Sequence, residues 1–197
     1  RLKEAIGLFE RTLADSERVL GPDNPHTLTA RNNLAGAYES AGRLERAIDL
    51  YEQNLAEALR VLGPDHPHTL TSRNNLAHAY RSAGRLERAI DLHKKNLADR
   101  ERVLGPDNPD TLTSRNNLAH AYRSAGRLER AIGLFERNLA DRERVLGPDN
   151  PDTLTSRNNL AHAYRSAGRL ERAIGLFERN LADRERVLGP DNPDTLT

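Results

Sequence analysis

Apolar residues recur along the chain at the spacing of an α-helix, in two kinds of stretch that alternate. In the first kind, Leu118, Ala119 and Tyr122 share one face and form a narrow apolar stripe. The second kind carries a broader stripe, which consists of Leu128, Ala131, Ile132, Phe135, Leu139 and Leu146. Neither amphipathic helix can bury its stripe alone, so the pattern predicts helices that pack against one another in pairs.

Residues that favour helix ends bound both stretches. Asn108 suits a helix start because its side chain can accept from an exposed backbone amide, and the proline after it needs no amide partner there. Gly126 and Gly147 suit helix ends because glycine tolerates left-handed backbone. We therefore predict helix A over about residues 109–125 and helix B over residues 128–146. The very short link between them predicts an antiparallel hairpin.

The hairpin recurs with a period of 42 residues. Residues 105–146 and 147–188 are identical, and residues 63–104 differ from them at six positions. A fixed period of about 20–50 residues is typical of a solenoid, in which each repeat mainly contacts its neighbours. We therefore expect one all-α array over residues 1–197. Its parts are a lone helix B (1–20), four full repeats (21–62, 63–104, 105–146 and 147–188) and the start of another helix A (189–197).

Composition narrows the classes of function. The 197 residues are 30% charged and 4% aromatic, and the net charge of +1 gives no general attraction to nucleic acid or to an anionic membrane. The chain has no cysteine, which excludes disulfide and thiolate chemistry. No apolar run approaches the roughly 20 residues of a membrane helix, and no signal peptide is visible. We expect a cytoplasmic protein, and the first residue, Arg1, suggests a piece of a longer one.

Catalysis is not expected, because it needs unlike groups that converge on one reacting atom, whereas an array repeats the same groups. Ser124 and His120 lie four residues apart, but no orienting acid accompanies them. One histidine per repeat, with no acid or cysteine in its row, is a poor match for a zinc site. The glycines form no phosphate-binding motif. We predict no enzymatic activity, no cofactor and no metal site.

The spacing resembles the tetratricopeptide repeat. That family's succession of large, small, aromatic, turn, small and aromatic residues is matched by Leu118, Ala119, Tyr122, Gly126, Ala131 and Phe135. The sequences NNLAHAY, AGRLERAI and RVLGPDNPD, together with the period of 42, are closer to one subclass, the kinesin light chains and their bacterial relatives. The resemblance implies a right-handed superhelix of stacked hairpins, a non-enzymatic scaffold for protein partners, and a bacterial source.

Some positions depart from the pattern of that family. The family usually has a small apolar residue where this chain has Thr12, Asn54, Asn96, Asn138 and Asn180. Because a buried polar group needs a partner, we expect either a hydrogen bond between helices or local loosening at these positions. His93 replaces an aromatic residue, and we expect it to be partly buried and to weaken its repeat, with a pH-dependent role as the alternative. Arg115 is expected to extend across the hairpin edge toward water, as are its counterparts Arg73 and Arg157.

The face of helix A opposite the apolar stripe carries a row of polar residues. Asn116, His120 and Arg123 are spaced four and then three residues apart, which places them on one helical face. We call this set and its counterparts the polar row; it consists of Asn74, His78, Arg81, Asn116, His120, Arg123, Asn158, His162 and Arg165. The first full repeat instead has Asn32, Gly36 and Glu39. In the family that the chain resembles, helix A lines a concave groove, so the resemblance implies that the polar row faces a ligand.

The side chains of the polar row suggest which ligand that is. Asparagine can both donate to and accept from a peptide amide, and arginine presents a planar fork that matches carboxylates. We predict that the row binds a peptide or a partner segment, and, as a finer prediction, one with acidic character. The alternative is that the row is a solvated face whose polarity only keeps the array soluble.

Two other functions stay open. The ends of an array of identical repeats can be complementary, so copies of the chain could stack end to end into a superhelical filament. Single-stranded RNA is the less favoured alternative, because surfaces that bind it usually offer stacking aromatic side chains and the polar row has none. The near-identity of the repeats is compatible with recent duplication, with a periodic ligand or with consensus engineering.

Overall fold

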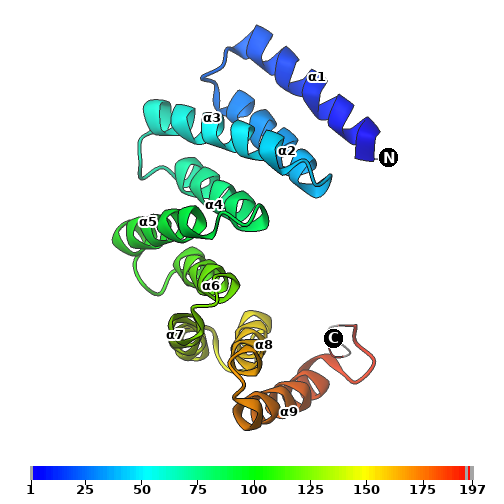
Figure 1. The fold of residues 1–197 in the computed structure, drawn as a ribbon, viewed down its shortest axis with the longest axis vertical. Coiled ribbons are helices and arrows are strands. Elements are labelled where there is room, and N and C mark those ends of the chain that lie inside the picture. Colours follow the sequence, from blue (N-terminus) through cyan, green and yellow to red (C-terminus); the bar gives the residue numbers. More distant parts are fainter. Residues whose placement is uncertain (1, 194, 196–197) are drawn as a thin grey trace. The chain divides into compact units, whose positions relative to one another are not determined.

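The computed structural model describes residues 2–193 and residue 195. Within this part of the chain there are nine α-helices and no β-strand, which confirms the predicted all-α class (Figure 1). The helices A, of 16 residues each, are α2 (Pro25–Ser40), α4 (Pro67–Ser82), α6 (Pro109–Ser124) and α8 (Pro151–Ser166). The helices B, of 19 residues each, are α1 (Leu2–Leu20), α3 (Leu44–Leu62), α5 (Leu86–Leu104), α7 (Leu128–Leu146) and α9 (Leu170–Leu188).

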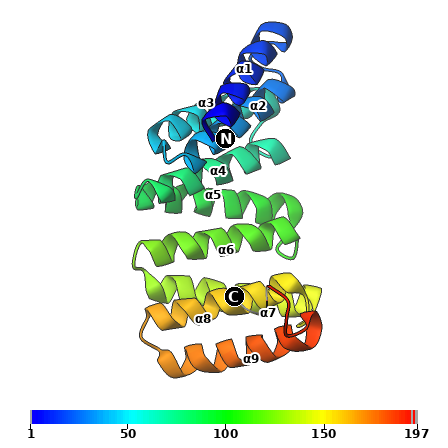
Figure 2. The ribbon, with the colours of Figure 1, turned by 90° about the vertical axis from the view of Figure 1, so that its right-hand side faces the viewer.

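The chain forms two compact units, Arg1–Val103 and Leu104–Thr197. In the first unit, α1 packs against α2, α2 against α3, and α3 against α4. In the second unit, α6 packs against α7, α7 against α8, and α8 against α9. Within each unit these neighbours run antiparallel, as both views of the ribbon show (Figure 2). The hairpins predicted from the short link between helices A and B are therefore present.

Each helix A begins and ends as its sequence predicts. At the start of α8, Oδ1 of Asn150 accepts from the backbone amide of Asp152 at 2.9 Å. In the second full repeat His66 replaces this asparagine, and its Nδ1 takes over the role by accepting from the amide of His68 at 3.1 Å. Gly126, with φ of 70°, follows α6, and the chain then reverses into α7. The left-handed backbone there is the reason for a glycine.

The core of each unit is thin and consists of alanine, aliphatic and single aromatic side chains. In the first unit Ala47, Ile48 and Tyr51 of α3 are buried, and in the second unit Leu112 and Phe135 are fully buried. Alanine at the crossing points lets neighbouring helices approach closely. Each buried leucine, isoleucine or phenylalanine contributes about 1.5–3 kcal/mol, so a single hairpin has little to set against its ordering entropy and needs its neighbours.

Three arginines lie inside the hairpins, and the prediction that they extend toward water is wrong. Arg73, Arg115 and Arg157 are 0–1% exposed. In each, Nη1 donates at 2.6 Å to an aspartate of the helix B in the same hairpin, and these aspartates are Asp99, Asp141 and Asp183. The carboxylate partner inside the hairpin offsets the cost of burying the guanidinium, so the side chain does not need to reach solvent.

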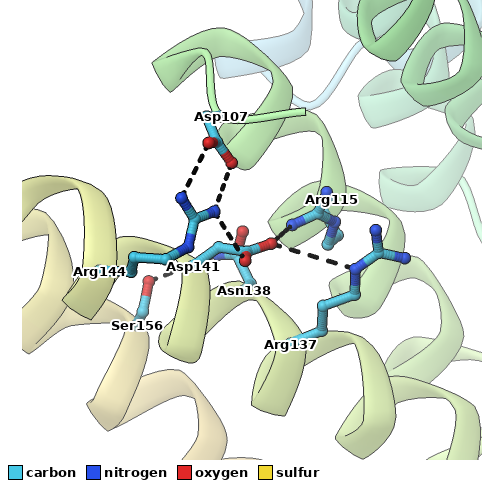
Figure 3. A network of polar contacts seen from close by, with 7 residues as sticks. All are labelled: Asp107, Arg115, Arg137, Asn138, Asp141, Arg144 and Ser156. Atoms are coloured by element: carbon cyan, nitrogen blue, oxygen red, sulfur yellow. Dashed lines mark hydrogen bonds and ion pairs between the residues drawn. The ribbon is translucent and has the colours of Figure 1, made fainter. Parts of the chain in front are cut away.

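These buried pairs extend into ion-pair networks at the hairpin ends (Figure 3). Asp141 accepts from both Arg115 and Arg144, at 2.6 and 3.2 Å. Arg144 also donates to both carboxylate oxygens of Asp107, in the loop before α6, at 2.5 and 2.9 Å. The hydrogen bond from Arg144 lowers the pKa of Asp107. The network therefore ties the loop that precedes helix A to the last turns of helix B.

Three of the polar residues that replace small apolar ones find hydrogen-bond partners, as one of the two expectations required, whereas Nδ2 and Oδ1 of the buried Asn96 have none among the described residues. Nδ2 of Asn54 donates to Oγ of Ser72 at 3.0 Å, which links α3 to α4. Asn138 and Ser156 link α7 to α8 in the same way, at 3.4 Å. The hydroxyl of Thr12 instead donates to a backbone carbonyl within α1. His93 is 2% exposed, which is more complete burial than the sequence predicted.

The predicted start of another helix A, residues 189–197, contains no helix in its described part. It does, however, take the course that precedes α2. The hydroxyl of Thr195 donates to the carbonyl of Gly189 at 2.9 Å, as that of Thr27 donates to the carbonyl of Gly21 at 2.8 Å. Residues 194, 196 and 197 of this predicted segment, and residue 1 of the predicted lone helix B, lie outside the described residues.

Candidate functional site

The polar row lies on α4 in the first unit and on α6 and α8 in the second, at least partly exposed at every position. The side chain of His78 is 52% exposed. On the opposite face Leu118 and Tyr122 are buried, as the apolar stripe predicts. The two predicted faces of helix A are therefore present, and the row is accessible to a ligand.

A second asparagine of α4 and of α8, which the sequence pattern did not single out, connects each helix to the helix A of the preceding repeat. Nδ2 of Asn75 in α4 donates to Oδ1 of Asn32 in α2 at 2.9 Å. In the second unit, Asn159 of α8 donates in the same way to Asn116 of α6, at 3.1 Å. The carbonyl oxygen of Asn116 is thus already engaged, although it keeps a second acceptor position. These bonds position the row and reduce what its asparagines can offer a ligand.

The histidines of the second unit pack on aromatic rings. The ring of His120 stands edge-on to that of Phe135, with centroids 5.0 Å apart, and His162 and Phe177 repeat this arrangement. Burial lowers the pKa of His162, and the positive charges of Arg165 and Arg123 lower it further. The lowered pKa favours the neutral imidazole at pH 7, so His162 adds little positive charge to the row beside its arginines.

The row has a different character in the first unit, because Glu39 of α2 stands where later repeats have arginine. Its Oε1 lies 2.8 Å from Nδ1 of His78 and accepts from the hydroxyl of Ser82 at 3.2 Å. The second ring nitrogen of His78 lies 2.8 Å from Nη2 of Arg81. The hydrogen bond with His78 is the main cause that lowers the pKa of Glu39. Here a carboxylate already occupies the polar row.

A ladder of aromatic, cationic and acidic contacts runs along the hairpin turns. In the second unit, the guanidinium of Arg130 lies 5.7 Å from the ring centroid of Tyr122, a cation–π contact. The hydroxyl of Tyr164 donates to Glu136 of the preceding helix B. Arg169 pairs with Glu129 at 2.6 Å, again between consecutive repeats. Because these charges are paired with one another, this edge offers a ligand less than the polar row does.

Neither a cluster of metal ligands nor a membrane-spanning helix is found among the described residues. They contain no group of three or more histidine, aspartate or glutamate side chains arranged to hold a metal ion. No helix among them is both long and apolar enough to cross a membrane.

Comparison with known sequences agrees with the repeat geometry. The sequence model of the tetratricopeptide repeat matches residues 1–56, 32–98, 74–140 and 115–183, which together cover most of the chain. The chain belongs to the tetratricopeptide repeat family. One relative, Protein KINESIN LIGHT CHAIN-RELATED 3 of Arabidopsis thaliana, is 46% identical over 43 residues, which are 22% of this chain. The match spans 7% of the length of that protein.

Solved structures show the same fold. A candidate kinesin light chain of Podosopora anserina, with nearly identical tetratricopeptide-like repeats, is 31% identical. It superposes with a TM-score of 0.83 over 94% of this chain and 88% of that one. BtubC (BKLC) of P. vanneervenii, at 24% identity and a TM-score of 0.81 over 95% and 75% of the two chains, shares the fold. The resemblance to kinesin light chains is thereby confirmed, and with it the membership in a family of protein-interaction scaffolds.

Proposed function

We propose that this tetratricopeptide repeat chain binds an acidic segment of a partner protein on the polar row of α6 and α8. One observation carries the proposal. Arg123 and Arg165 occupy the same position on consecutive helices A, which the bond between Asn159 and Asn116 joins. None of the residues that form the row in this unit is acidic. Carboxylates are therefore the groups that the row lacks and that its arginines suit.

The neighbouring side chains support binding of a peptide rather than of a lone anion. Asn116 and Asn158 supply amide donors beside the arginines, and the imidazoles of His120 and His162 can exchange hydrogen bonds with a backbone. Exposed ion pairs contribute about 0–1 kcal/mol each, so several contacts are needed for useful affinity. Since these contacts face water, the binding weakens as salt is added.

The test compares two charge-matched double variants in a fluorescence anisotropy titration with a labelled glutamate-rich peptide. Arg123→Gln with Arg165→Gln removes two positive charges from the polar row. The control, Arg137→Gln with Arg179→Gln, removes two charges from exposed positions of α7 and α9 in the same unit. We expect the row variant to lose at least tenfold in affinity and the control to lose little. Equal losses of affinity in the two variants would show that only the net charge matters. Unchanged binding by the row variant would show that the ligand binds elsewhere.

Self-association is a second candidate, because α9 exposes an apolar face that its sequence twin α7 buries. Ile174 and Leu181 are 55% and 47% exposed, whereas Ile132 and Leu139 of the identical helix α7 are 3% and 8% exposed. The face borders a hollow of about 360 Å³, in which Oδ1 of the buried Asn180 has no hydrogen-bond partner. A second copy of the chain could cover this face.

The helix types distinguish two modes of self-association. In α7 the corresponding face is covered by a helix A, but the exposed helix at the other end of the chain, α1, is a helix B. Stacking end to end would therefore pack α9 of one copy against α1 of the next, which are both helices B. It needs the exposed faces of both helices. Ile174→Glu should prevent both the pairing of two copies through their α9 faces and end-to-end stacking. Leu8→Glu, on the exposed face of α1, should prevent only end-to-end stacking. Light scattering that reports a monomer over a hundredfold range of concentration would remove this candidate.

A further inference from the structure

The second unit bridges its consecutive helices A with an arginine. Nη2 of Arg142 in α7 donates to Oγ1 of Thr113 in α6 at 3.5 Å, and Nη1 donates to the carbonyl of Asp152 in α8 at 2.9 Å. The carboxylate of Asp152 lies 3.8 Å from the same Nη1 and balances the charge of Arg142, which is 6% exposed. Because a guanidinium stays protonated in proteins, this bridge is a permanent cation with an acid beside it.

In the first unit both residues of this bridge are replaced. The fully buried Ala58 of α3 stands where α7 has Arg142, and His68 of α4 stands where α8 has Asp152. The imidazole now reaches the threonine of the preceding helix A, with Nε2 of His68 3.4 Å from Oγ1 of Thr29 in α2. Thr29 corresponds to the threonine that Arg142 contacts in the second unit. A titratable side chain has therefore taken the place of a permanent cation.

Neighbouring hydrogen bonds indicate the protonation state of His68. The hydroxyl of Thr29 already donates to the carbonyl of Pro25 at 3.0 Å, so it can only accept from Nε2. Oγ of the buried Ser72 accepts from Nδ2 of Asn54 at 3.0 Å, which leaves its hydrogen for Nδ1 of His68, 3.5 Å away. Together these contacts fit a neutral imidazole with its hydrogen on Nε2. Protonation of Nδ1 turns the acceptor that faces Ser72 into a second donor.

The surroundings of His68 disfavour a positive charge. The side chain is half-buried in the first turn of α4, where the helix dipole also repels cations. Burial is the main cause that lowers the pKa of His68, and the charge of His66 lowers it further, against the opposing effect of a backbone hydrogen bond.

Other titratable and charged side chains stand at the ends of the elements around this contact. They are His26 of α2, Glu57 and Arg60 of α3, and Asp65 of the loop with Arg102 of α5. Glu57 accepts from Arg60 at 2.6 Å, and Asp65 accepts from Arg102 at 2.8 Å. Both carboxylates are thus engaged with arginines rather than with the imidazole.

We propose that His68 makes the contact of α4 with α2 and α3 a pH-sensitive joint, which is closed at neutral pH and loosens when the imidazole is protonated. The protonated ring loses its acceptor for Ser72. It also has no counterpart of Asp152, because His68 itself occupies that position. The joint lies between α2, which carries Glu39, and α4, which carries His78, so acid would alter this part of the polar row. The inference does not depend on the acidic-peptide site of the second unit.

The first test compares the full chain with His68→Asn, which keeps a side-chain donor and acceptor but does not titrate. Urea unfolding followed by circular dichroism gives an unfolding equilibrium constant at pH 7.5 and at pH 5.0. The contribution of neutral His68 is present above the unfolded pKa of about 6.5 and is lost as the pH falls below it. We therefore expect the constant to rise between these pH values at least threefold more in the unaltered chain than in the variant. Equal rises would overturn the proposal.

Hydrogen exchange measured by mass spectrometry locates the effect, because the sequence of residues 63–72 occurs once in the chain. The two proteins are compared at the same pH, so that the intrinsic exchange rates nearly cancel. We expect the ratio of the exchange rates of this segment, unaltered chain to variant, to be at least threefold larger at pH 5.0 than at pH 7.5. A ratio that does not change with pH would show a merely structural contribution and would contradict the proposal.

A double variant and an internal control complete the test. Ala58→Arg with His68→Asp transfers the bridge of the second unit to the first, and it should remove the acid sensitivity of residues 63–72. Residues 105–114 and 147–156, which lack this histidine, should exchange alike in the unaltered chain and in both variants at either pH. Circular dichroism verifies that the variants fold. Acid sensitivity of residues 63–72 that persists in the folded double variant would show that His68 is not its source.

Discussion

The two units present the same face of helix A with opposite chemistry. In the first unit Glu39 accepts from Ser82 and pairs with His78, so the row carries its own carboxylate. In the second unit Arg123 occupies the position of Glu39, and the row keeps only neutral and positive side chains. The backbone and the buried stripe are common to both. A substitution at one partly exposed position of a constant scaffold thus changes the charge that the surface presents.

The first and the last full repeats also differ beneath the surface, in the partners of one buried arginine. Arg31 in the first unit pairs with Glu17, whose side chain is 43% exposed. Arg157 in the second unit is fully buried, and it pairs with both Glu143 of α7 and Asp183 of α9. The second arginine therefore joins three helices, while Glu57 replaces the corresponding aspartate in the first unit. The last full repeat consequently depends more on its buried arginine than the first full repeat does.

Replacing the buried arginines should give the largest difference. Arg157→Ala removes the cation that Glu143 and Asp183 share and opens a cavity, although Arg186 still pairs with Asp183. We expect a loss of about 2–4 kcal/mol, below the usual cost of breaking a buried pair because the acids are partly exposed. Arg31→Ala should cost about 1 kcal/mol or somewhat more, mostly from lost packing. Urea unfolding followed by circular dichroism measures both. Equal losses of stability in the two variants would contradict the distinction between the two repeats.

The buried asparagines should give a smaller effect that is similar in both units. Asn54→Ala and Asn138→Ala each remove the hydrogen bond to a buried serine hydroxyl, of which Ser72 keeps a contact of 3.5 Å with Nδ1 of His68. We expect each change to cost about 1–2 kcal/mol. The control is Thr12→Ala, because Thr12 bonds only to its own helix and faces no serine. Unfolding curves of the asparagine variants that match the control would show that the bonds between helices contribute nothing.

A pH titration should show the influence of the arginines on the second unit. Burial, Arg165 and Arg123 lower the pKa of His162, so NMR should find it below the ordinary value of about 6.5. Arg165→Gln should raise it. The imidazole of His162 binds a proton more readily in the unfolded state than in the folded state. Its contribution to stability is therefore present at neutral pH and is lost as the pH falls through the unfolded pKa. His162→Asn assigns the resonance, since residues 105–146 and 147–188 are identical. A pKa above the ordinary value would contradict the electrostatic description.

Periodicity and helix-end residues were enough to predict the fold. The stripe of Leu118 and Tyr122 indicated the buried face, and Asn108 and Gly147 indicated helix limits to within about a residue. The partners of buried groups could not be predicted in this way. Arg115 meets an aspartate 26 residues away, and Asn159 meets an asparagine 43 residues away. Such pairs depend on how helices pack in register, which the spacing within one helix does not determine.

The sequence also identified the polar row but not the proposed pH-sensitive joint. Three donors on one helical face were visible as soon as Asn116, His120 and Arg123 were placed on a helix. The joint was not, because it arises from the replacement of two side chains on different helices whose counterparts contact each other in the second unit. A comparison of the repeats position by position, with facing positions taken together, would have found the pair of Ala58 and His68.

Exchanging the residues that distinguish the two units tests the account most directly. Arg123→Glu gives the second unit the carboxylate of the first, and Glu39→Arg gives the first unit the cation of the second. In anisotropy titrations with a glutamate-rich peptide, we expect Arg123→Glu to weaken binding at least tenfold. Glu39→Arg should strengthen binding or add a second site, with a steeper dependence on salt. If both variants bind the peptide as the unaltered chain does, the polar row does not carry the recognition.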